Sequence, residues 1–344
     1  PTEVHSVAQF KQLFAVVDSA TEASIAVQDF FANGGQHAVI VAAAAESRRS
    51  TISELVRALN LLSPPAGEPP LVQVVCMPDM ARRVDPLEHH QYAELLLRAT
   101  GFCVQNRMFL IVDPNTAGDG VDDIETWLEA NTSWGSTNSG AYFPRLQTPA
   151  GRAAGHDSVA ASGAVAGVIA RTDAHRGVWK APAGHESSVG AVVATEVSDA
   201  QQSPLNRRAV NVIRRFDTVG TVIWGARTGS GSIASEYRYI PVRRTALFIE
   251  HSLQQGLQWA VFEPNGEPLW ASIRQSITDF MTELWRAGAF TGSTQSEAFV
   301  VRCDDTTMSR AELRRGRTVA VVGFAPLKPA EFVVLQVVLE RRTR

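Results

Sequence analysis

The first third of the chain alternates helical and strand-like patterns of apolar positions. Three short apolar runs predict strands that are covered on both faces: residues 38–44, 71–76 and 108–112. Helical spacing and capping signals predict helices around them: 25–32, 51–61, 86–97 (ending towards Gly101) and 121–130. Alternating strands and helices at this spacing predict an α/β fold with a parallel sheet and right-handed crossovers.

The middle of the chain is less regular. Residues 132–160 are rich in Ser, Thr, Gly and Asn and are predicted as loop, and the mixed segment 182–204 as an exposed excursion. Between them, Ser162 to Ile169 is small and apolar, which predicts a tightly packed helix. Val219 to Trp224 is typical of a strand.

The last third has longer helical patterns followed by strands. Helices are predicted over Arg244–Gln255 and Pro268–Arg286, and strands over Phe299–Cys303 and Thr318–Gly323. In the second helix apolar residues recur on one face: Leu269, Trp270, Ile273, Ile277, Phe280, Met281 and Leu284.

The final apolar segment, Phe332 to Leu339, requires a partner. It contains four valines and one polar residue, Gln336, so it has high strand propensity and two apolar faces. Alone in water, its open backbone groups would favour aggregation. It can return as an interior strand of its own sheet, or it can complete a sheet in a neighbouring copy. Burial of its aliphatic side chains would contribute on the order of 10 kcal/mol before ordering costs. The pattern alone leaves both arrangements open.

Composition narrows the classes of function. The chain has 344 residues, 45% hydrophobic and 19% charged, and a net charge of −3, so a globular fold is expected and nucleic-acid binding is disfavoured. Cys76, Cys103 and Cys303 form no CxxC pair and are expected to be free thiols, which fits folding in a reducing cytoplasm. No apolar run approaches the roughly 20 residues of a membrane span. No signal peptide is seen, because the chain opens with Pro1-Thr2-Glu3 and not with a basic and then an apolar stretch.

Signatures of catalysis or of bound cofactors are missing from the sequence. It contains no GxxxxGK[ST] phosphate loop and no GxSxG nucleophile elbow, and no GxGxxG follows the first predicted strand. His89 and His90 begin a helix, where adjacent side chains point about 100° apart and cannot chelate one metal ion. Four acidic residues follow a predicted strand without calcium-loop spacing: Asp113, Asp119, Asp122 and Asp123. We predict no catalytic residue, cofactor or metal site, and therefore no enzyme.

Six stretches match a known family in order: SGAVAGVIARTDAHRGVWKAPAG (162–184), LNRRAVNVIRRF (205–216), VIWGART (222–228), YRYIPVRRTALFIEHSL (237–253), QWAVFEPNGEPLW (258–270) and GFAPLKPAEFVV (323–334). FFANGG (30–35) and CMPDM (76–80) extend the match towards the start of the chain. Through them the chain resembles the contractile tail sheath family of tailed phages, R-type bacteriocins and extracellular injection systems.

The resemblance implies a fold and three segments. Residues 1–228 would form a subtilisin-like α/β domain without protease function, 229–330 a carboxy-terminal α+β domain near an inner tube, and 331–344 an extended arm. The arm would donate a strand to a neighbouring subunit through Phe332, Val333, Val334, Leu335, Val337, Val338 and Leu339. A helix facing the tube would carry Arg244, Phe248, His251 and Gln255.

The resemblance also implies partners and a function. The subunits would assemble in the bacterial cytoplasm as stacked hexameric rings around an inner tube protein, between baseplate and terminal cap proteins. They would contract by rigid-body rearrangement and drive the tube through a target envelope. Family members usually carry an amino-terminal arm ahead of the region where Pro1 lies. Either this arm is disordered or trimmed, or the chain is a variant, so the amino-terminal half of the strand exchange stays open. A non-contracting shell protein and a hydrolase-like enzyme are the alternatives.

Overall fold

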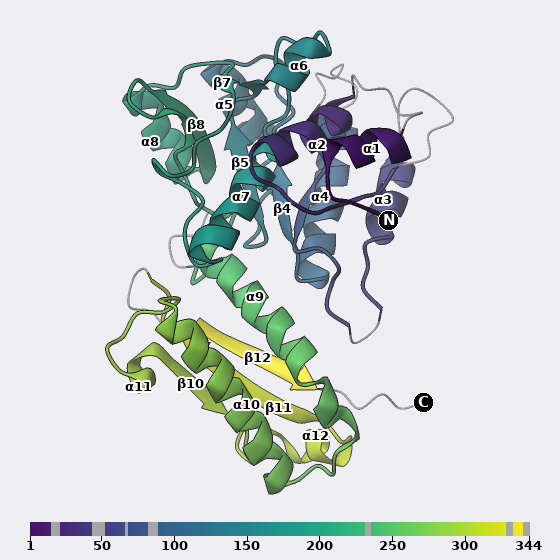
Figure 1. Cartoon of the computed structure of the whole chain (residues 1–344), viewed down its shortest axis with the longest axis vertical. Helices are drawn as coiled ribbons and strands as arrows, with labels where there is room; N and C mark the ends of the chain where they lie inside the picture. The colour runs from purple at the N-terminus through teal and green to yellow at the C-terminus, as the bar shows by residue number, and fades with distance from the viewer. Residues whose placement is uncertain are drawn as a thin grey trace. The chain divides into compact units, whose positions relative to one another are not determined.

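The computed structural model describes residues 1–14, 21–42, 52–65, 68–81, 89–230, 235–327 and 333–339. The chain forms two compact units, residues 1–63 with 70–243 and residues 64–69 with 244–344 (Figure 1). The first unit therefore continues past the predicted boundary at residue 228. Within the described ranges, no helix is both long and apolar enough to span a bilayer.

A five-stranded sheet forms the centre of the first unit. Its strands lie in the order β3 (Val74–Cys76), β4 (Phe109–Val112), β5 (Ser139–Phe143), β8 (Val210–Phe216) and β9 (Gly220–Ile223). The first four are parallel and β9 runs antiparallel to β8. All four residues of β4 are buried, as expected for a parallel strand covered on both faces. The predicted parallel α/β sheet is confirmed.

Helices of the first unit connect these strands and pack closely in one place. They are α1 (Val7–Leu13), α2 (Glu22–Ala32), α3 (Ile52–Asn60), α4 (His89–Gln105), α5 (Val121–Ala130), α6 (Pro149–Ala153), α7 (Ser162–Arg176) and α8 (Asp199–Arg207). Helix α7 packs directly on α2: a Cβ atom added to Gly163 would lie 2.3 Å from the carbonyl oxygen of Ala26. The small residues predicted to allow tight packing therefore do so.

Three predictions in this unit were wrong. The first predicted strand is reduced to β2 (Ala38–Ile40), which pairs antiparallel with β1 (Thr2–Val4) outside the parallel sheet and is only half-buried. Residues 43–44 of that prediction lie outside the described residues. Helix α4 continues through Gly101 to Gln105, because one glycine inside a helix costs only about 1 kcal/mol.

The third wrong prediction concerns the two segments that are predicted to lack regular structure. The predicted loop 132–160 contains β5, a two-residue β6 (Leu146–Gln147) and α6, and residues 182–204 contain β7 (Val192–Val193) and the start of α8. Strand β5 has the sequence SGAYF, whose small residues hide the strand pattern. At Gly140 a small residue is needed, because this position lies against Phe109 and Ile240.

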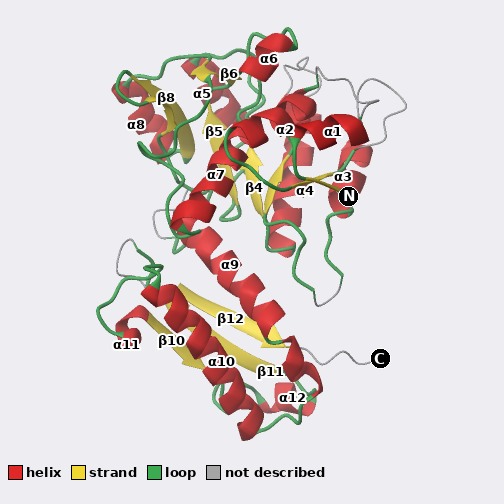
Figure 2. Cartoon of the chain, in the orientation of Figure 1, coloured by secondary structure: helices red, strands yellow, loops and turns green. Residues whose placement is uncertain are grey.

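The second unit consists of helices and one antiparallel sheet. Helix α9 (Ile240–Gly256) begins in the first unit and ends here, followed by the 3-10 helix η3 (Gln258–Phe262), α10 (Glu267–Arg286), α11 (Gln295–Ala298) and α12 (Arg310–Arg314). The sheet order is β10 (Phe299–Arg302), β11 (Thr318–Phe324) and β12 (Val333–Leu339). Helix α10 lies against β10 and β11 (Figure 2).

The predicted apolar face of α10 is confirmed. Its buried positions are Leu269, Ile273, Ile277, Met281 and Leu284, while Trp270 and Phe280 are half-buried. This spacing of three and four residues places one stripe of the helix against the sheet.

Candidate functional site

The carboxy-terminal strand β12 pairs with β11 of its own chain. The pairing is antiparallel over all seven residues, from Val333 opposite Phe324 to Leu339 opposite Thr318 (Figure 1). Within this single chain, the structure therefore shows the intrachain alternative. Phe332 lies outside the described residues. Donation of Val333–Leu339 to a neighbouring copy stays a prediction.

Strand β11 is the element that depends on this pairing. It is the central strand of the sheet, and Val319, Ala320, Val322 and Phe324 have no exposed side-chain surface. Removal of β12 would leave one edge of β11 with open N–H and C=O groups. This edge of β11 therefore requires a strand, and the chain that supplies it is not fixed by the pairing itself.

The helix predicted to face a tube presents few of its predicted residues to solvent. On α9, Arg244 and His251 are buried, Phe248 is half-buried and packs against Phe280, and only Gln255 is exposed. Direct contact of Arg244 or His251 with another protein is disfavoured in this conformation. The role of α9 towards a tube stays a prediction.

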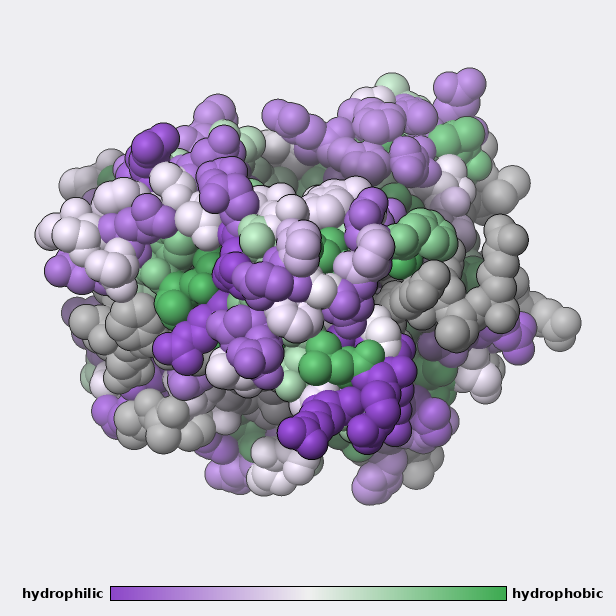
Figure 3. All heavy atoms as spheres, turned by 90° about the horizontal axis from the view of Figure 1, so that it is seen from below, coloured by the Kyte–Doolittle hydropathy of each residue, from purple (hydrophilic) through white to green (hydrophobic). Residues whose placement is uncertain are grey.

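Other apolar side chains are exposed in the second unit. Phe262 is 79% exposed and Trp259 45% exposed, both on η3, and Val300 and Leu327 are also exposed. Figure 3 shows apolar residues as separate patches between hydrophilic ones on the face seen from below. Large exposed aromatic side chains are enriched in protein interfaces, so η3 is a candidate contact surface.

A buried polar cluster lies beyond the carboxyl ends of β4 and β5 in the first unit. Its centre is Arg145, two residues after β5. The guanidinium forms an ion pair with Glu22 of α2, donates to the carbonyl oxygen of Ala81 at 2.9 Å, and donates from Nε to the Ser158 hydroxyl at 3.1 Å. The second Glu22 oxygen accepts from the Ala160 backbone N–H at 2.7 Å. One buried arginine thus joins three segments that are distant in sequence.

Asp113 extends the cluster to the start of α7. It follows β4 directly and accepts a hydrogen bond of 2.9 Å from the Ser162 backbone N–H. Burial raises the pKa of Asp113 to about 6, against the hydrogen bonds from Ser162 and the charge of Arg145, which lower it. Ser162 itself is fully buried and thus closed to substrate.

The other predicted acids have structural roles. Asp119 accepts from the Ser158 hydroxyl at 3.2 Å and lies 3.9 Å from Arg145. Asp122 and Asp123 occupy the first turn of α5, where Asp123 accepts from the Gly120 N–H. Negative charge is favourable at a helix amino terminus, so both acids stabilise the start of α5. Sequence patterns do not reveal the role of Arg145, because its partners come from four separate segments.

The histidines and cysteines considered in the sequence analysis lie at separate positions in the structure. His90 is exposed in the first turn of α4, and the side chain of His89 lies outside the described residues. Cys76, Cys103 and Cys303 are free thiols, the last two buried. The prediction of free cysteines is confirmed.

The chain is similar to known proteins both in one domain and over nearly its whole length. The model of the phage tail sheath C-terminal domain family matches residues 233–340. The tail sheath protein of Vibrio phage KVP40 is 26% identical over 180 residues, which cover 52% of this chain and 26% of the phage protein. The chain thus spans about a quarter of the length of this relative.

Two solved structures are similar over nearly all of the chain. The baseplate of the anti-feeding prophage (AFP), 6-fold symmetrised, contains a chain with a TM-score of 0.73 and 29% identity, covering 97% of this chain and 86% of that one. The sheath complex of the extracellular contractile injection system PVC, in its contracted state, gives a TM-score of 0.75 and 26% identity, covering 97% and 85%.

Proposed function

We infer that this chain, a member of the contractile tail sheath family, is a structural sheath subunit of a contractile injection system. The observation that carries this inference is the likeness over 97% of the chain to sheath-system subunits in AFP and PVC. This likeness includes both compact units, and the family match covers β10, β11 and β12.

We further propose that the subunits stack as six-membered rings around an inner tube and contract by rigid-body rearrangement. The sixfold symmetry of the AFP baseplate and the contracted PVC sheath support this proposal. Contacts between bodies would switch, and the free energy released by the better packing of the contracted lattice would drive the tube through an envelope. Baseplate and cap proteins would bind the two ends of the sheath, which would assemble in a bacterial cytoplasm.

Exchange of β12 would supply the links that survive contraction. In the exchanged form, the register of Val333–Leu339 on β11 would be kept, but the two strands would belong to different subunits. Such domain swapping recreates existing contacts and needs no new interface chemistry. The seven-residue ladder would therefore hold neighbours together while the remaining contacts rearrange.

The experiment that tests the function is deletion of residues 331–344. The full chain should form helical tubes that electron microscopy resolves in a long and a short state. The truncated chain should remain soluble and form no tubes, because the open edge of β11 has no strand from a neighbour. Normal tubes from the truncated chain would refute the arm, and full-chain tubes with a single pitch would favour a non-contracting shell.

A disulfide pair tests exchange directly. Val321 and Gln336 are register partners, so Val321→Cys with Gln336→Cys places two thiols within bonding reach. Oxidised tubes should then give a ladder of covalent oligomers on a denaturing gel. Val321→Cys with Leu339→Cys is the matched control, since Leu339 pairs with Thr318. Only intrachain disulfides in assembled tubes would contradict exchange.

We propose no catalytic role, and the burial of Ser162 supports this. A fluorophosphonate probe should leave the folded chain unlabelled. Labelling of Ser162, lost in Ser162→Ala, would revive the hydrolase alternative.

A further inference from the structure

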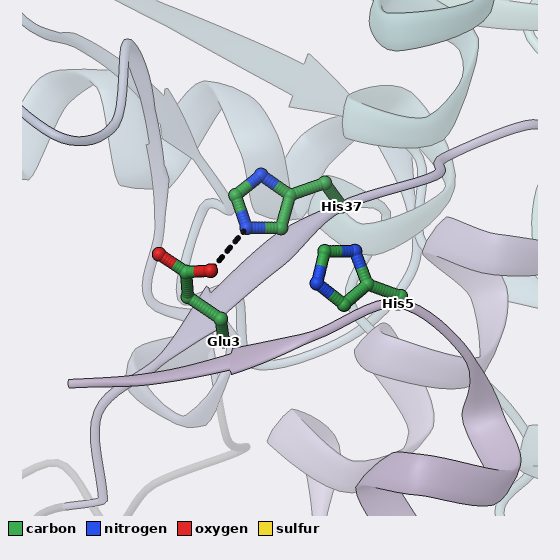
Figure 4. A group of neighbouring side chains, drawn as sticks. All are labelled: Glu3, His5 and His37. Atoms are coloured by element: carbon green, nitrogen blue, oxygen red, sulfur yellow. Dashed lines mark ion pairs between the residues drawn. The ribbon is translucent and has the colours of Figure 1, made fainter.

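Two histidines and a glutamate meet on the surface of the first unit. Glu3, His5 and His37 each offer a ligand atom, and these atoms all lie within 4.8 Å of one another (Figure 4). Among the described residues, this is the group of His, Cys, Asp and Glu side chains whose geometry suits a metal ion. It comes from the amino-terminal strand β1 and from the segment that enters β2.

The strand register explains why the three side chains share one face. Val4 of β1 pairs with Ala38 of β2 and is fully buried, so its neighbours Glu3 and His5 point to the opposite, solvent side. The same antiparallel register, continued by one residue, places His5 opposite His37. Glu3 lies diagonal to His37 on the same face, within reach across two strands. The juxtaposition is therefore built into the backbone pairing.

The contacts between the side chains are close and polar. The imidazole rings of His5 and His37 are nearly parallel, with centroids 4.8 Å apart, and the Glu3 carboxylate lies 3.6 Å from Nε2 of His37. The backbone N–H of His5 donates to Oε1 of Gln9 at 2.8 Å, which holds the turn between β1 and α1. All three side chains are exposed, so they can rotate the remaining distance towards a shared ion.

We propose that Glu3, His5 and His37 bind a divalent transition-metal ion of the zinc class, which joins β1 to β2. Two imidazole nitrogens and one carboxylate oxygen are a ligand set that Zn²⁺ uses with one position left for water. Tetrahedral Zn²⁺ needs neighbouring ligand atoms about 3.3 Å apart, as follows from Zn–N and Zn–O bonds of about 2.0–2.2 Å. Mg²⁺ and Ca²⁺ prefer oxygen ligands and fit this nitrogen-rich set poorly.

The ion would act as a cross-link for the amino-terminal segment. The β1–β2 sheet has two strands of three residues, and ribbons of this size are marginal by themselves. A metal bridge from residues 3 and 5 to residue 37 closes a long loop, the situation in which a clip restricts the unfolded chain most. The bound ion should therefore slow local opening of β1 and α1 without changing the sheet of the second unit.

The test measures binding of Zn²⁺ alone to the full, untagged chain by calorimetry, with Co²⁺ absorption as a second probe of coordination. Saturable binding of one ion per chain is expected. Loss of a partner that only supports a ligand weakens metal sites by about 10–100-fold, so His5→Gln and His37→Gln should each weaken binding at least about tenfold. His175→Gln is the matched control, an exposed histidine on α7, and should leave the affinity unchanged.

Hydrogen exchange adds a readout that does not depend on the affinity. Zn²⁺ should increase amide protection in β1 and α1 of the wild-type chain and of His175→Gln, and should have no such effect in His37→Gln. Equal Zn²⁺ affinity in wild type and His37→Gln, or absence of saturable binding in the folded wild-type chain, would overturn the proposal. Far-ultraviolet circular dichroism confirms that each variant is folded, so a failed variant cannot imitate loss of a ligand.

Discussion

The two main sheets of this chain are stabilised by different kinds of contact. In the first unit, the four parallel strands of the five-stranded sheet are separated in sequence by helices, and a buried arginine joins segments beyond the carboxyl ends of β4 and β5. In the second unit, the three-stranded sheet is completed by β12, the last described strand of the chain. Interior contacts hold the first sheet together, whereas the second sheet depends on the edge strand β12.

This difference bears on assembly. A strand in the middle of a parallel sheet cannot leave without dismantling the core, because both of its edges are paired. An edge strand is paired on one side only, so another copy can supply it at little cost. In the proposed sheath, the first unit would therefore move as a rigid body, and the second unit would carry the links between subunits.

The largest effect is expected from breaking the buried ion pair between Arg145 and Glu22 in the first unit. Arg145→Leu leaves the buried Glu22 carboxylate without its counter-charge, and loss of one partner of a buried pair costs about 3–5 kcal/mol. Chemical denaturation should report this loss in the unfolding transition of the first unit. The double variant Glu22→Leu with Arg145→Leu should recover part of it. If Arg145→Leu lowered the free energy of unfolding by less than about 1 kcal/mol, the ion pair would contribute no more than an exposed pair does.

Core truncations test whether the two units unfold separately. Ile124 in α5 and Ile277 in α10 are both fully buried, so Ile124→Ala and Ile277→Ala should each cost about 2–4 kcal/mol. Calorimetry should show that each substitution shifts one transition and leaves the other in place. One transition shifted equally by both would mean that the units are a single cooperative body.

Buried carboxyls should make the first unit sensitive to pH. Burial raises the pKa of Asp29 to about 7 from 3.8, helped by the nearby Glu22 and opposed by the Thr148 hydrogen bond. The folded state therefore binds the Asp29 proton more tightly than the unfolded state does. The stability that results from this difference is fully present below pH 3.8 and is lost as the pH rises through about 7.

Replacement of Asp29 by a neutral residue tests this direction. Asp29→Asn should raise the free energy of unfolding at pH 8 by about 1–3 kcal/mol and do less at pH 5. Melting temperatures at the two pH values provide the measurement, and the exposed Asp305→Asn is the control. A gain that is larger at pH 5 than at pH 8 would contradict the assigned direction.

The smallest effect is expected at an exposed ion pair of the same unit. Arg176 and Glu186 lie 2.6 Å apart, but both side chains are more than half exposed. Arg176→Gln should cost less than about 1 kcal/mol in chemical denaturation. A cost equal to that of Arg145→Leu would show that burial is not what distinguishes the two pairs.

Local pattern predicted the elements whose burial repeats regularly. Helix α5 has the predicted bounds, the apolar face of α10 was predicted from its spacing, and β4 was predicted from a continuous apolar run. The pattern failed for β5, where packing against Phe109 and Ile240 selects small residues, and for β2, whose partner is β1. Neither failure is visible in a window of neighbouring residues.

The sequence by itself determined that the chain has a parallel α/β part and that its final apolar segment needs a strand partner. Only the tertiary structure decided that β12 lies on β11 in register, that Arg145 joins Glu22 to Ser158, and that His5 meets His37. The physical reason is that periodicity reports which face of an element is buried. The choice of partner depends on contacts between segments far apart in the chain, and no local pattern records them.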